Sequence, residues 1–375
     1  MSARPGSAVV VKVGSSVVAD RRGEPRQSAL AQICAAVARA RERAQAVALV
    51  SSGAIARGVS ALELSGRPAS IAELQAASAV GQGRLFAIYD RLLSSHGLVG
   101  AQVLLTASDL HERTRYINAR RTLATLLGWG VVPVINENDT TATDEISFGD
   151  NDFLAAQVAT ALHAQLLVLL TDVEGIYSAD PRTDQDAQLI REVADPEQLA
   201  ELLERSAGAG TSQWGTGGMR AKLAAAQIAT AAGVPTIICS GLAQGALDAA
   251  LEGANSGTRV DGRPREEPAF KLWLRFAKPA RGALIVDEGA ARALRAQGSS
   301  LLPVGILAVQ GDFQAGDAVE VRERSGALVA KGLVSYSASE IERIKGLDSR
   351  ALRELISDTA DEEAIHRDQL VLAGN

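Results

Sequence analysis

Short apolar runs alternate with longer amphipathic stretches along the first two thirds of the chain. The apolar runs predict buried strands at residues 8–13, 46–50, 98–105, 131–135, 166–170 and 234–239. The stretches between them repeat apolar residues at helical spacing, which predicts helices at residues 27–43, 71–95, 115–127, 152–162 and 219–232. Strands that alternate with helices in this way indicate an α/β fold with three layers (αβα), in which helices cover both faces of a mostly parallel sheet.

The pattern changes near residue 255. Residues 253–268 collect Gly, Asn, Ser, Arg and Pro without helical periodicity, which is typical of a connection. We therefore predict a first domain at 1–260, a linker at 261–278, a small, mostly β domain at 279–365 and a tail at 366–375. Within the second domain, turns separate the expected strands at 283–286, 305–310, 318–322 and 330–335, and one helix is expected at 290–297.

Composition narrows the class of protein. A length of 375 residues with 47% hydrophobic residues suits two domains with ample cores. The net charge of −6 argues against a protein that wraps nucleic acid. Two distant cysteines, Cys34 and Cys239, indicate neither a disulfide framework nor a zinc site, and a reducing cytosol fits best. Since we find no stretch of signal-peptide or membrane-spanning character, we expect a soluble, cytoplasmic protein.

Two lysines stand beside glycine-rich turns of the kind that bind phosphate. Lys12 follows the apolar residues 8–11 and precedes Gly14-Ser15-Ser16, and Lys222 follows the glycine-rich segment 215–219 at the start of a helix. Helix-start amides attract anions, and two converging cations offset the oxygen charge that develops in phosphoryl transfer. The alternatives to a phosphate site are that Lys12 is a solvated residue at the edge of the sheet and that the glycine-rich segment is a flexible turn before a surface helix. The P-loop and Rossmann glycine patterns are absent from the sequence.

Polar motifs follow four of the predicted strands, at residues 12–16, 51–53, 136–139 and 171–172. In parallel sheets ligands bind beyond the carboxyl ends of the strands, so the four motifs predict one crevice. Asp150 and Asp152 flank Asn151 at a helix start, where they either cap the helix or form a polar pocket. Asp152 is also a candidate to hold the two lysines in place. The four scattered histidines support no hydrolase triad.

Together these motifs resemble those of bacterial glutamate 5-kinases, which belong to the amino-acid kinase superfamily. The similarity covers nearly the whole chain, including a C-terminal segment that resembles a PUA domain. It therefore implies the amino-acid kinase fold for the first domain. It rests on the segments 12–16, 51–55, 80–82, 136–139, 149–152, 171–172, 215–222, 287–289 and 299–303.

The resemblance also implies roles for individual residues. Lys12 and Lys222 would neutralise the phosphate oxygens, and Asp152 would orient both lysines. Glutamate would be bound by Ser52, Asp139 and Asn151. ATP would be bound by Lys12, Thr171, Asp172, Thr216, Gly217, Gly218, Met219, Arg220, Ala221 and Lys222. Magnesium would arrive with ATP, with no metal site of the protein's own. Where relatives often carry small hydroxyl residues, this chain has Arg220-Ala221, so Arg220 is expected to supply a phosphate contact instead.

The implied activity is phosphorylation of the γ-carboxylate of L-glutamate by ATP, the first step of proline biosynthesis. The resemblance further implies feedback inhibition by proline, a homodimer or homotetramer, and transfer of the product to a glutamyl phosphate reductase. N-acetylglutamate or carbamate as acceptor remains an alternative. RNA binding through the C-terminal domain is another, but residues 279–375 carry 11 Lys and Arg against 15 Asp and Glu, which makes an unfavourable surface for phosphates.

Overall fold

The computed structural model describes residues 8–20, 22–106, 109–110, 112–141, 151–179, 181, 184–205, 218–254, 256–262, 271, 274–275, 280–348 and 363–373. The chain divides into two compact units, Met1–Glu266 and Glu267–Asn375. The linker expected at 261–278 spans this division, and most of it lies outside the described residues. Within the described part, no helix combines the length and apolar character that crossing a bilayer requires.

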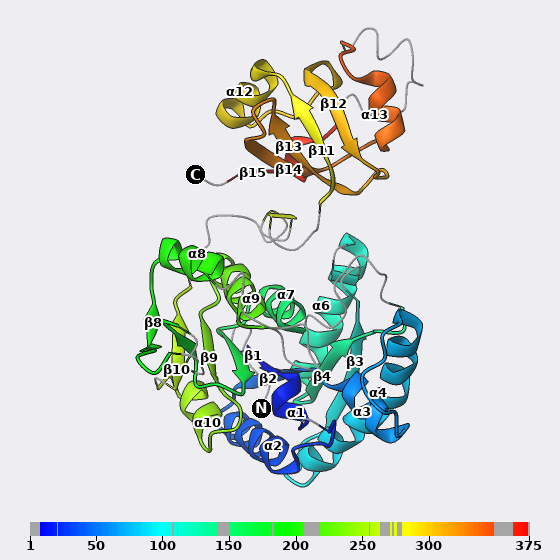
Figure 1. The fold of residues 1–375 in the computed structure, drawn as a ribbon. Helices are drawn as coiled ribbons and strands as arrows, with labels where there is room; N and C mark the ends of the chain where they lie inside the picture. The colour runs from blue at the N-terminus through cyan, green and yellow to red at the C-terminus, as the bar shows by residue number, and fades with distance from the viewer. Residues whose placement is uncertain are drawn as a thin grey trace. The chain divides into compact units, whose positions relative to one another are not determined.

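An eight-stranded sheet runs through the first unit in the order β3-β4-β2-β1-β5-β9-β10-β8 (Figure 1). Every neighbouring pair is parallel except β9 and β10, which confirms the predicted mostly parallel sheet. The strands are β1 (Ala8–Val13), β2 (Ala46–Ser51), β3 (Gly100–Leu105), β4 (Val132–Glu137), β5 (Leu166–Thr171), β8 (Glu192–Val193), β9 (Thr236–Ser240) and β10 (Gly257–Val260); β6 (Ile176–Tyr177) and β7 (Leu189–Ile190) form a separate hairpin.

Helices cover both faces of this sheet, as the sequence predicts (Figure 1). They are α1 (Ser15–Val18), α2 (Gln27–Glu42), α3 (Ala54–Ala61), α4 (Ile71–Ser94), α6 (Arg113–Gly128), α7 (Asn151–Leu162), α8 (Pro196–Arg205), α9 (Met219–Ala231) and α10 (Ala246–Leu251). Helices α2 and α10 pack together on one face, and α6, α7 and α9 lie on the other, with α7 in contact with β1, β2, β4 and β5. The pattern did not predict the short helices α1, α3, α8 and α10.

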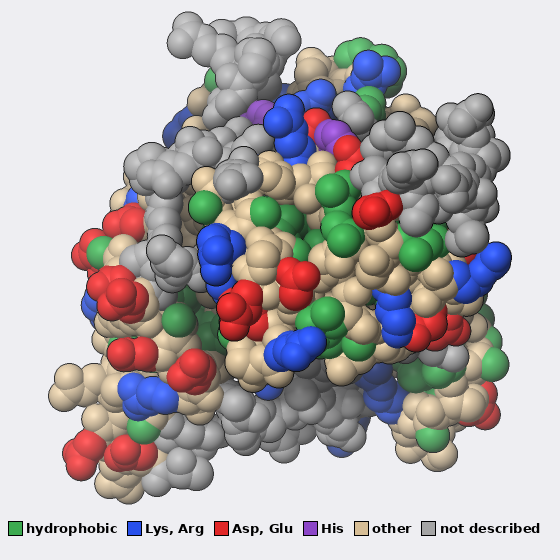
Figure 2. All heavy atoms as spheres, turned by 90° about the horizontal axis from the view of Figure 1, so that it is seen from above, with side chains coloured by type: hydrophobic (Ala, Val, Ile, Leu, Met, Phe, Trp, Pro, Cys, Tyr) green, Lys and Arg blue, Asp and Glu red, His purple; other side chains and the backbone are tan. Residues whose placement is uncertain are grey.

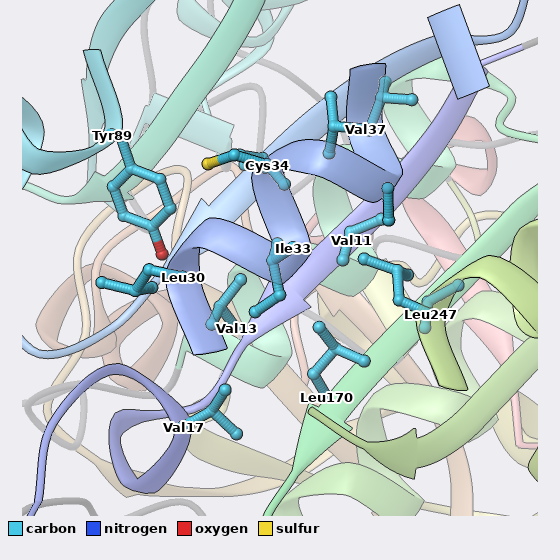
Figure 3. Packing of buried hydrophobic residues seen from close by; sticks show 14 of the residues in the cluster. Val11, Val13, Val17, Leu30, Ile33, Cys34, Val37, Tyr89, Leu170 and Leu247 are labelled. Carbon is cyan, nitrogen blue, oxygen red and sulfur yellow. The ribbon is translucent and has the colours of Figure 1, made fainter. Parts of the chain in front are cut away.

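The strand alternation of β1 divides its side chains between these two faces. Val11 and Val13 pack in one cluster with Leu30 and Ile33 of α2 (Figure 3). Burial of one such side chain contributes about 1.5–3 kcal/mol, so this face of β1 is fixed firmly against α2. Because successive side chains of a strand point to opposite faces, Lys12 lies on the face covered by α7 and α9. A lysine between two core valines is therefore directed to the helix layer that contains Asp152.

Helices α3 and α4 pack with their backbones in direct contact. A Cβ atom added at Gly58 would lie 1.7 Å from the carbonyl oxygen of Ala77, and one added at Gly81 would lie 1.9 Å from that of Ala54. No real Cβ atom tolerates such distances, so both positions require glycine. Helix α4 begins at a capping box in which the side chains of Ser70 and Glu73 each accept the other's backbone N–H. These contacts fix the position of α4 along α3.

The second unit contains a five-stranded sheet in the order β12-β11-β13-β14-β15. Its elements are β11 (Ala280–Val286), α12 (Glu288–Gln297), η3 (Pro303–Gly305), β12 (Ile306–Gly311), β13 (Ala318–Glu323), β14 (Leu328–Leu333), α13 (Ala338–Ile344), η4 (Arg367–Gln369) and β15 (Leu370–Leu372). The predicted small β module is confirmed. The pattern predicted one helix here and the structure adds α13. Strand β15 pairs with β14, so residues assigned to a tail belong to the sheet.

Candidate active site

The site lies at the carboxyl ends of four neighbouring strands. β4, β2, β1 and β5 are adjacent and parallel, so the polar residues that follow them meet at one edge of the sheet. The backbone N–H of Ser52 donates to the carbonyl of Val13 at 3.1 Å, and that of Gly14 donates to Leu170 at 3.2 Å. These hydrogen bonds join the loops after β2, β1 and β5. The polar motifs that the sequence predicts to converge therefore follow neighbouring strands at one edge of the sheet.

At the centre of this edge, one buried carboxylate contacts two lysines. Lys12 Nζ lies 2.8 Å from Asp152 Oδ1, and Lys222 Nζ lies 3.1 Å from Asp152 Oδ2. The three side chains come from β1, α7 and α9, and α7 packs against both other elements. Asp152 is fully buried, whereas the lysine side chains are only 5% and 6% exposed. The charges of these three side chains alone sum to +1, and all three side chains are largely shielded from water.

The charge state of Asp152 follows from these contacts. Burial alone would raise its pKa, but the attraction and hydrogen bonds of Lys12 and Lys222 outweigh burial and bring the pKa below its ordinary value. Asp152 is thus ionised near neutral pH. Each of its oxygens holds one lysine, so the carboxylate fixes the separation of the two ammonium groups.

Gly14 keeps the space beside Lys12 open. A Cβ atom at this position would lie 2.9 Å from the carbonyl oxygen of Leu170 and 3.8 Å from Lys12 Nζ. Any larger residue would therefore push β1 away from β5 or crowd the ammonium group. Glycine is therefore required at position 14, because the chain after β1 passes close to the backbone of β5 there.

Ser52 and Asn151 are neighbours of this cluster. The backbone of Ser52 binds Val13, the residue after Lys12, and Asn151 directly precedes Asp152. Ser52 is buried and is followed by Gly53, whose φ of +100° starts α3 in the left-handed region that favours glycine. Asn151 is the first residue of α7, next to Asp152, and is 5% exposed. Its Oδ1 atom is buried and finds no hydrogen-bond partner among the described residues. Such an atom is a natural acceptor for a donor group on a ligand.

Asp139, two residues after β4, differs from Asp152 in that its described hydrogen-bond partner is a serine and not a lysine. Ser78 Oγ of α4 donates to Asp139 Oδ2 at 2.5 Å, while Oδ1 is buried and has no partner in the described part of the chain. Burial raises the pKa of Asp139, and the Ser78 hydrogen bond and the nearby Arg67 guanidinium partly offset that rise. Neither Ser78 nor Arg67 was predicted from the sequence.

Gln82, one turn after Ser78 on α4, binds the end of β4. Its Nε2 donates to the carbonyl of Glu137 at 3.1 Å, and its Oε1 accepts from Asn136 Nδ2 at 2.9 Å. Residues four apart share a face of a helix, so the spacing of Ser78 and Gln82 was the available signal for a polar face toward this loop. Gln82 belongs to the segment 80–82 that contributes to the family resemblance, but no role was predicted for it.

Apart from Lys12, the described residues assigned to ATP lie at the end of β5 and at the start of α9. Thr171 ends β5, and its hydroxyl donates to Asp172 Oδ1 at 3.2 Å. Gly218 is the N-cap of α9, whose first turn contains Met219, Arg220, Ala221 and Lys222. The first backbone N–H groups of a helix have no intrahelical partner and attract anions. Arg220 is exposed and Ala221 half-buried. Thr216 and Gly217 lie outside the described residues.

Family models match both units. The amino acid kinase family model matches residues 7–240, and the PUA domain model matches residues 282–356. A glutamate 5-kinase from Synechococcus sp. (strain JA-2-3B'a(2-13)) is 47% identical over 365 residues, which cover 97% of this chain and 98% of that protein. A glutamate 5-kinase from Meiothermus ruber is 46% identical, over 100% of this chain and 97% of that protein.

A solved structure shares the fold of the first unit. Carbamate kinase from Giardia lamblia, bound to AMP-PNP, aligns with a TM-score of 0.50 and 15% sequence identity, over 69% of this chain and 99% of that one. At such low identity the match concerns the fold alone.

Proposed function

The chain belongs to the amino acid kinase family and, within it, to the glutamate 5-kinases, and from this membership we propose that it transfers a phosphoryl group from ATP to the γ-carboxylate of L-glutamate. The observation that supports this reaction most is the buried cluster in which Asp152 holds Lys12 and Lys222. Transfer between two anionic groups requires fixed positive charge where the oxygens meet, and the cluster supplies it.

The two lysines have complementary positions for this reaction. Lys222 belongs to the first turn of α9, beside the amides proposed to bind the ATP phosphates. Lys12 lies near the end of β1, between β2, which Ser52 follows, and β5, which ends at Thr171. Charge that develops on the transferred phosphoryl group is stabilised from both sides. Because Asp152 holds both ammonium groups before the substrates bind, little reorganisation is needed in the transition state.

The acceptor needs no general base. A glutamate side chain has an unperturbed pKa of about 4.3, so its γ-carboxylate is already a nucleophile near neutral pH. The barrier comes instead from repulsion between this carboxylate and the phosphates. Lysine charge and helix-start amides reduce that repulsion.

For the glutamate molecule we propose contacts with Ser52, Asp139 and Asn151. Asp139 Oδ1 and Asn151 Oδ1 are buried acceptors without a partner among the described residues, and the ammonium group of an amino acid supplies donors. The carboxylate of Asp139 also supplies the opposite charge. The backbone N–H of Ser52 is used in the hydrogen bond to Val13 of β1, which leaves its hydroxyl for a ligand at the same edge.

For ATP we propose contacts with Thr171, Asp172, Thr216, Gly217 and residues 218–222, with Arg220 as an additional phosphate contact. Magnesium bound to ATP would neutralise phosphate charge. Asp152 is already held by two cations, so this chain's central contribution is lysine charge rather than a metal ligand. Mg²⁺ typically binds through substrate phosphates in such sites.

Family likeness also supports several wider proposals. We propose that proline, the product of the pathway, inhibits the enzyme, that the labile acyl phosphate passes to a glutamyl phosphate reductase, and that the protein assembles as a dimer or tetramer in the cytosol. For the domain limits we propose the boundaries given by the sequence analysis, with the second domain extended to include β15.

The first test is ATP turnover with magnesium in the presence of hydroxylamine, which traps an acyl phosphate as a hydroxamate. L-glutamate, N-acetylglutamate, aspartate and carbamate are compared as acceptors. We expect hydroxamate from L-glutamate alone. Product from another acid but not from glutamate would contradict the assignment of Ser52, Asp139 and Asn151.

RNA binding is the alternative from another class of function. The face of the molecule seen in Figure 2 intersperses acidic with basic side chains, and residues 279–375 have a net charge of −4. Counterion release from phosphates requires clustered cations. A gel shift with total RNA at several salt concentrations tests this alternative, and we expect no salt-dependent shift.

A further inference from the structure

Among the described residues, the carboxylate of Asp139 has a hydrogen bond at one of its two oxygens. Ser78 Oγ donates to Oδ2 at 2.5 Å, and Ser78 and Asp139 are 1% and 5% exposed. Oδ1 is equally shut off from bulk water, yet it finds no hydrogen-bond partner among the described residues. A buried carboxylate oxygen without a partner is costly, and a donor group of a bound ligand would remove that cost.

Ser78 cannot easily move away from this position. It lies on α4 directly after Ala77, whose carbonyl oxygen would be 1.7 Å from a Cβ atom at Gly58, so the backbones of α3 and α4 touch at this turn. Four residues along, Gln82 binds the backbone carbonyl of Glu137 and the side chain of Asn136 at the end of β4. The same helix face therefore fixes both the end of β4 and the carboxylate that follows it.

The hydroxyl of Ser78 has one proton to donate, and it points to Oδ2. This hydrogen bond sets the rotation of the carboxylate and uses one oxygen, which leaves Oδ1 as the atom that faces a ligand. It also favours the ionised form of Asp139, as does the Arg67 guanidinium, against the effect of burial.

We propose that Ser78 is a positioning residue for the acceptor site: it orients Asp139 so that Oδ1 receives the α-ammonium group of the amino acid, and the site thereby selects acceptors with a free amino group over N-acylated ones. This inference rests on the proposed glutamate kinase function. N-acylation removes the positive charge and two of the donors, so an N-acylated acceptor would leave the buried charge of Asp139 uncompensated.

The test compares Ser78→Ala with the wild-type enzyme at saturating Mg-ATP. The KM for L-glutamate is expected to rise about 10-fold or more, because a hydrogen bond to a charged group is lost. We expect kcat to stay within about 3-fold, because Ser78 does not contact the transferred phosphoryl group. As a matched control, Thr230→Val removes another buried helix hydroxyl, whose hydrogen bond goes to the carbonyl of Ala226, and should leave both constants unchanged.

Glutarate, which is glutamate without its amino group, separates orientation of Asp139 from general support of the fold. Its inhibition constant against L-glutamate should be the same for the wild type and Ser78→Ala, because it makes no use of Oδ1. Ser78→Cys, similar in size but with a weak donor, should also raise the KM for glutamate, and it replaces Ser78→Ala should that variant melt below the assay temperature.

The two hypotheses fail in different ways. If the wild-type enzyme makes no glutamyl hydroxamate, the proposed function is wrong regardless of Ser78. If the wild type is active but the variants keep its KM for glutamate, or weaken glutarate as much as glutamate, the positioning role of Ser78 is overturned while the proposed function stands.

Discussion

Replacing Asp152 by asparagine is the most direct test of the lysine cluster. The substitution preserves shape and removes one negative charge from a fully buried site between Lys12 and Lys222. The charge of the cluster then rises from +1 to +2, with both ammonium groups still largely shielded from water. Asp152→Asn should therefore reduce the stability of the folded protein as well as its activity.

The expected loss of stability follows from burial. Removing one partner of a buried ion pair costs about 3–5 kcal/mol, and here one carboxylate serves two lysines, so we expect a value at the upper end. The matched control is Asp248→Asn, which removes a carboxylate 2.7 Å from Arg39 on the surface. There the arginine side chain is 48% exposed, and such pairs contribute about 0.2–1 kcal/mol.

Urea unfolding of the three proteins at neutral and acid pH provides the measurement. The pKa of Asp152 is lower in the folded than in the unfolded state, so its contribution is fully present above the ordinary aspartate pKa of about 3.9 and is lost as the pH falls through the folded value. The difference between wild type and Asp152→Asn should therefore shrink only in strong acid. The reasoning would be refuted if the two aspartate variants were equally stable at pH 7.

Further predictions concern the donor site, the helix pair and the cysteines. Lys222→Ala should lower kcat about 100-fold or more in the hydroxamate assay, as loss of a major charge-stabilising donor does, and near-normal turnover of a folded variant would remove Lys222 from the mechanism. Gly81→Ala should destabilise the protein by about 1–3 kcal/mol or more, since its Cβ would lie 1.9 Å from a backbone oxygen of α3, whereas Gly83→Ala, with no atom within 4 Å, should stabilise α4 by about 0.8–1 kcal/mol in chemical denaturation. Cys34 and Cys239, fully buried with pKa values raised by burial to about 12, should resist a thiol reagent at pH 8 until guanidinium unfolds the chain; rapid labelling of the native protein would contradict this burial.

Much of the fold could be predicted because its parallel strands are buried on both faces and appear as continuous apolar runs, such as residues 8–13 and 166–170. The comparisons confirm the resemblance to glutamate 5-kinases and to a PUA domain. Several short helices and strands were not predicted, for reasons that are local to each of them. Helix α3 contains Gly58, which has low helix propensity and is required by the contact with α4. Strand β15 has only three residues, too few to show a period.

The site could be predicted in part. Lys12 and Lys222 stand beside glycines in the sequence, so local pattern points to them, and the order of the strands explains why the loops after β1, β2, β4 and β5 meet. Neither a neighbouring glycine nor the order of the strands points to Ser78. It is a serine in the middle of a long helix, 61 residues away from the aspartate that it contacts, and the packing of α4 against α3 holds it at that position.

The direct backbone contact between α3 and α4 also limits how an altered acceptor preference could arise. Two helices whose backbones touch at glycines cannot come closer together, so α4, which contains Ser78 and Gln82, has a fixed position beside the proposed acceptor site. A larger acid must then be accommodated by exchange of the polar residues at 78 and 82, or by a longer loop after β4. Mutational libraries that aim at new acceptors gain most from these positions and should leave Gly58 and Gly81 unchanged.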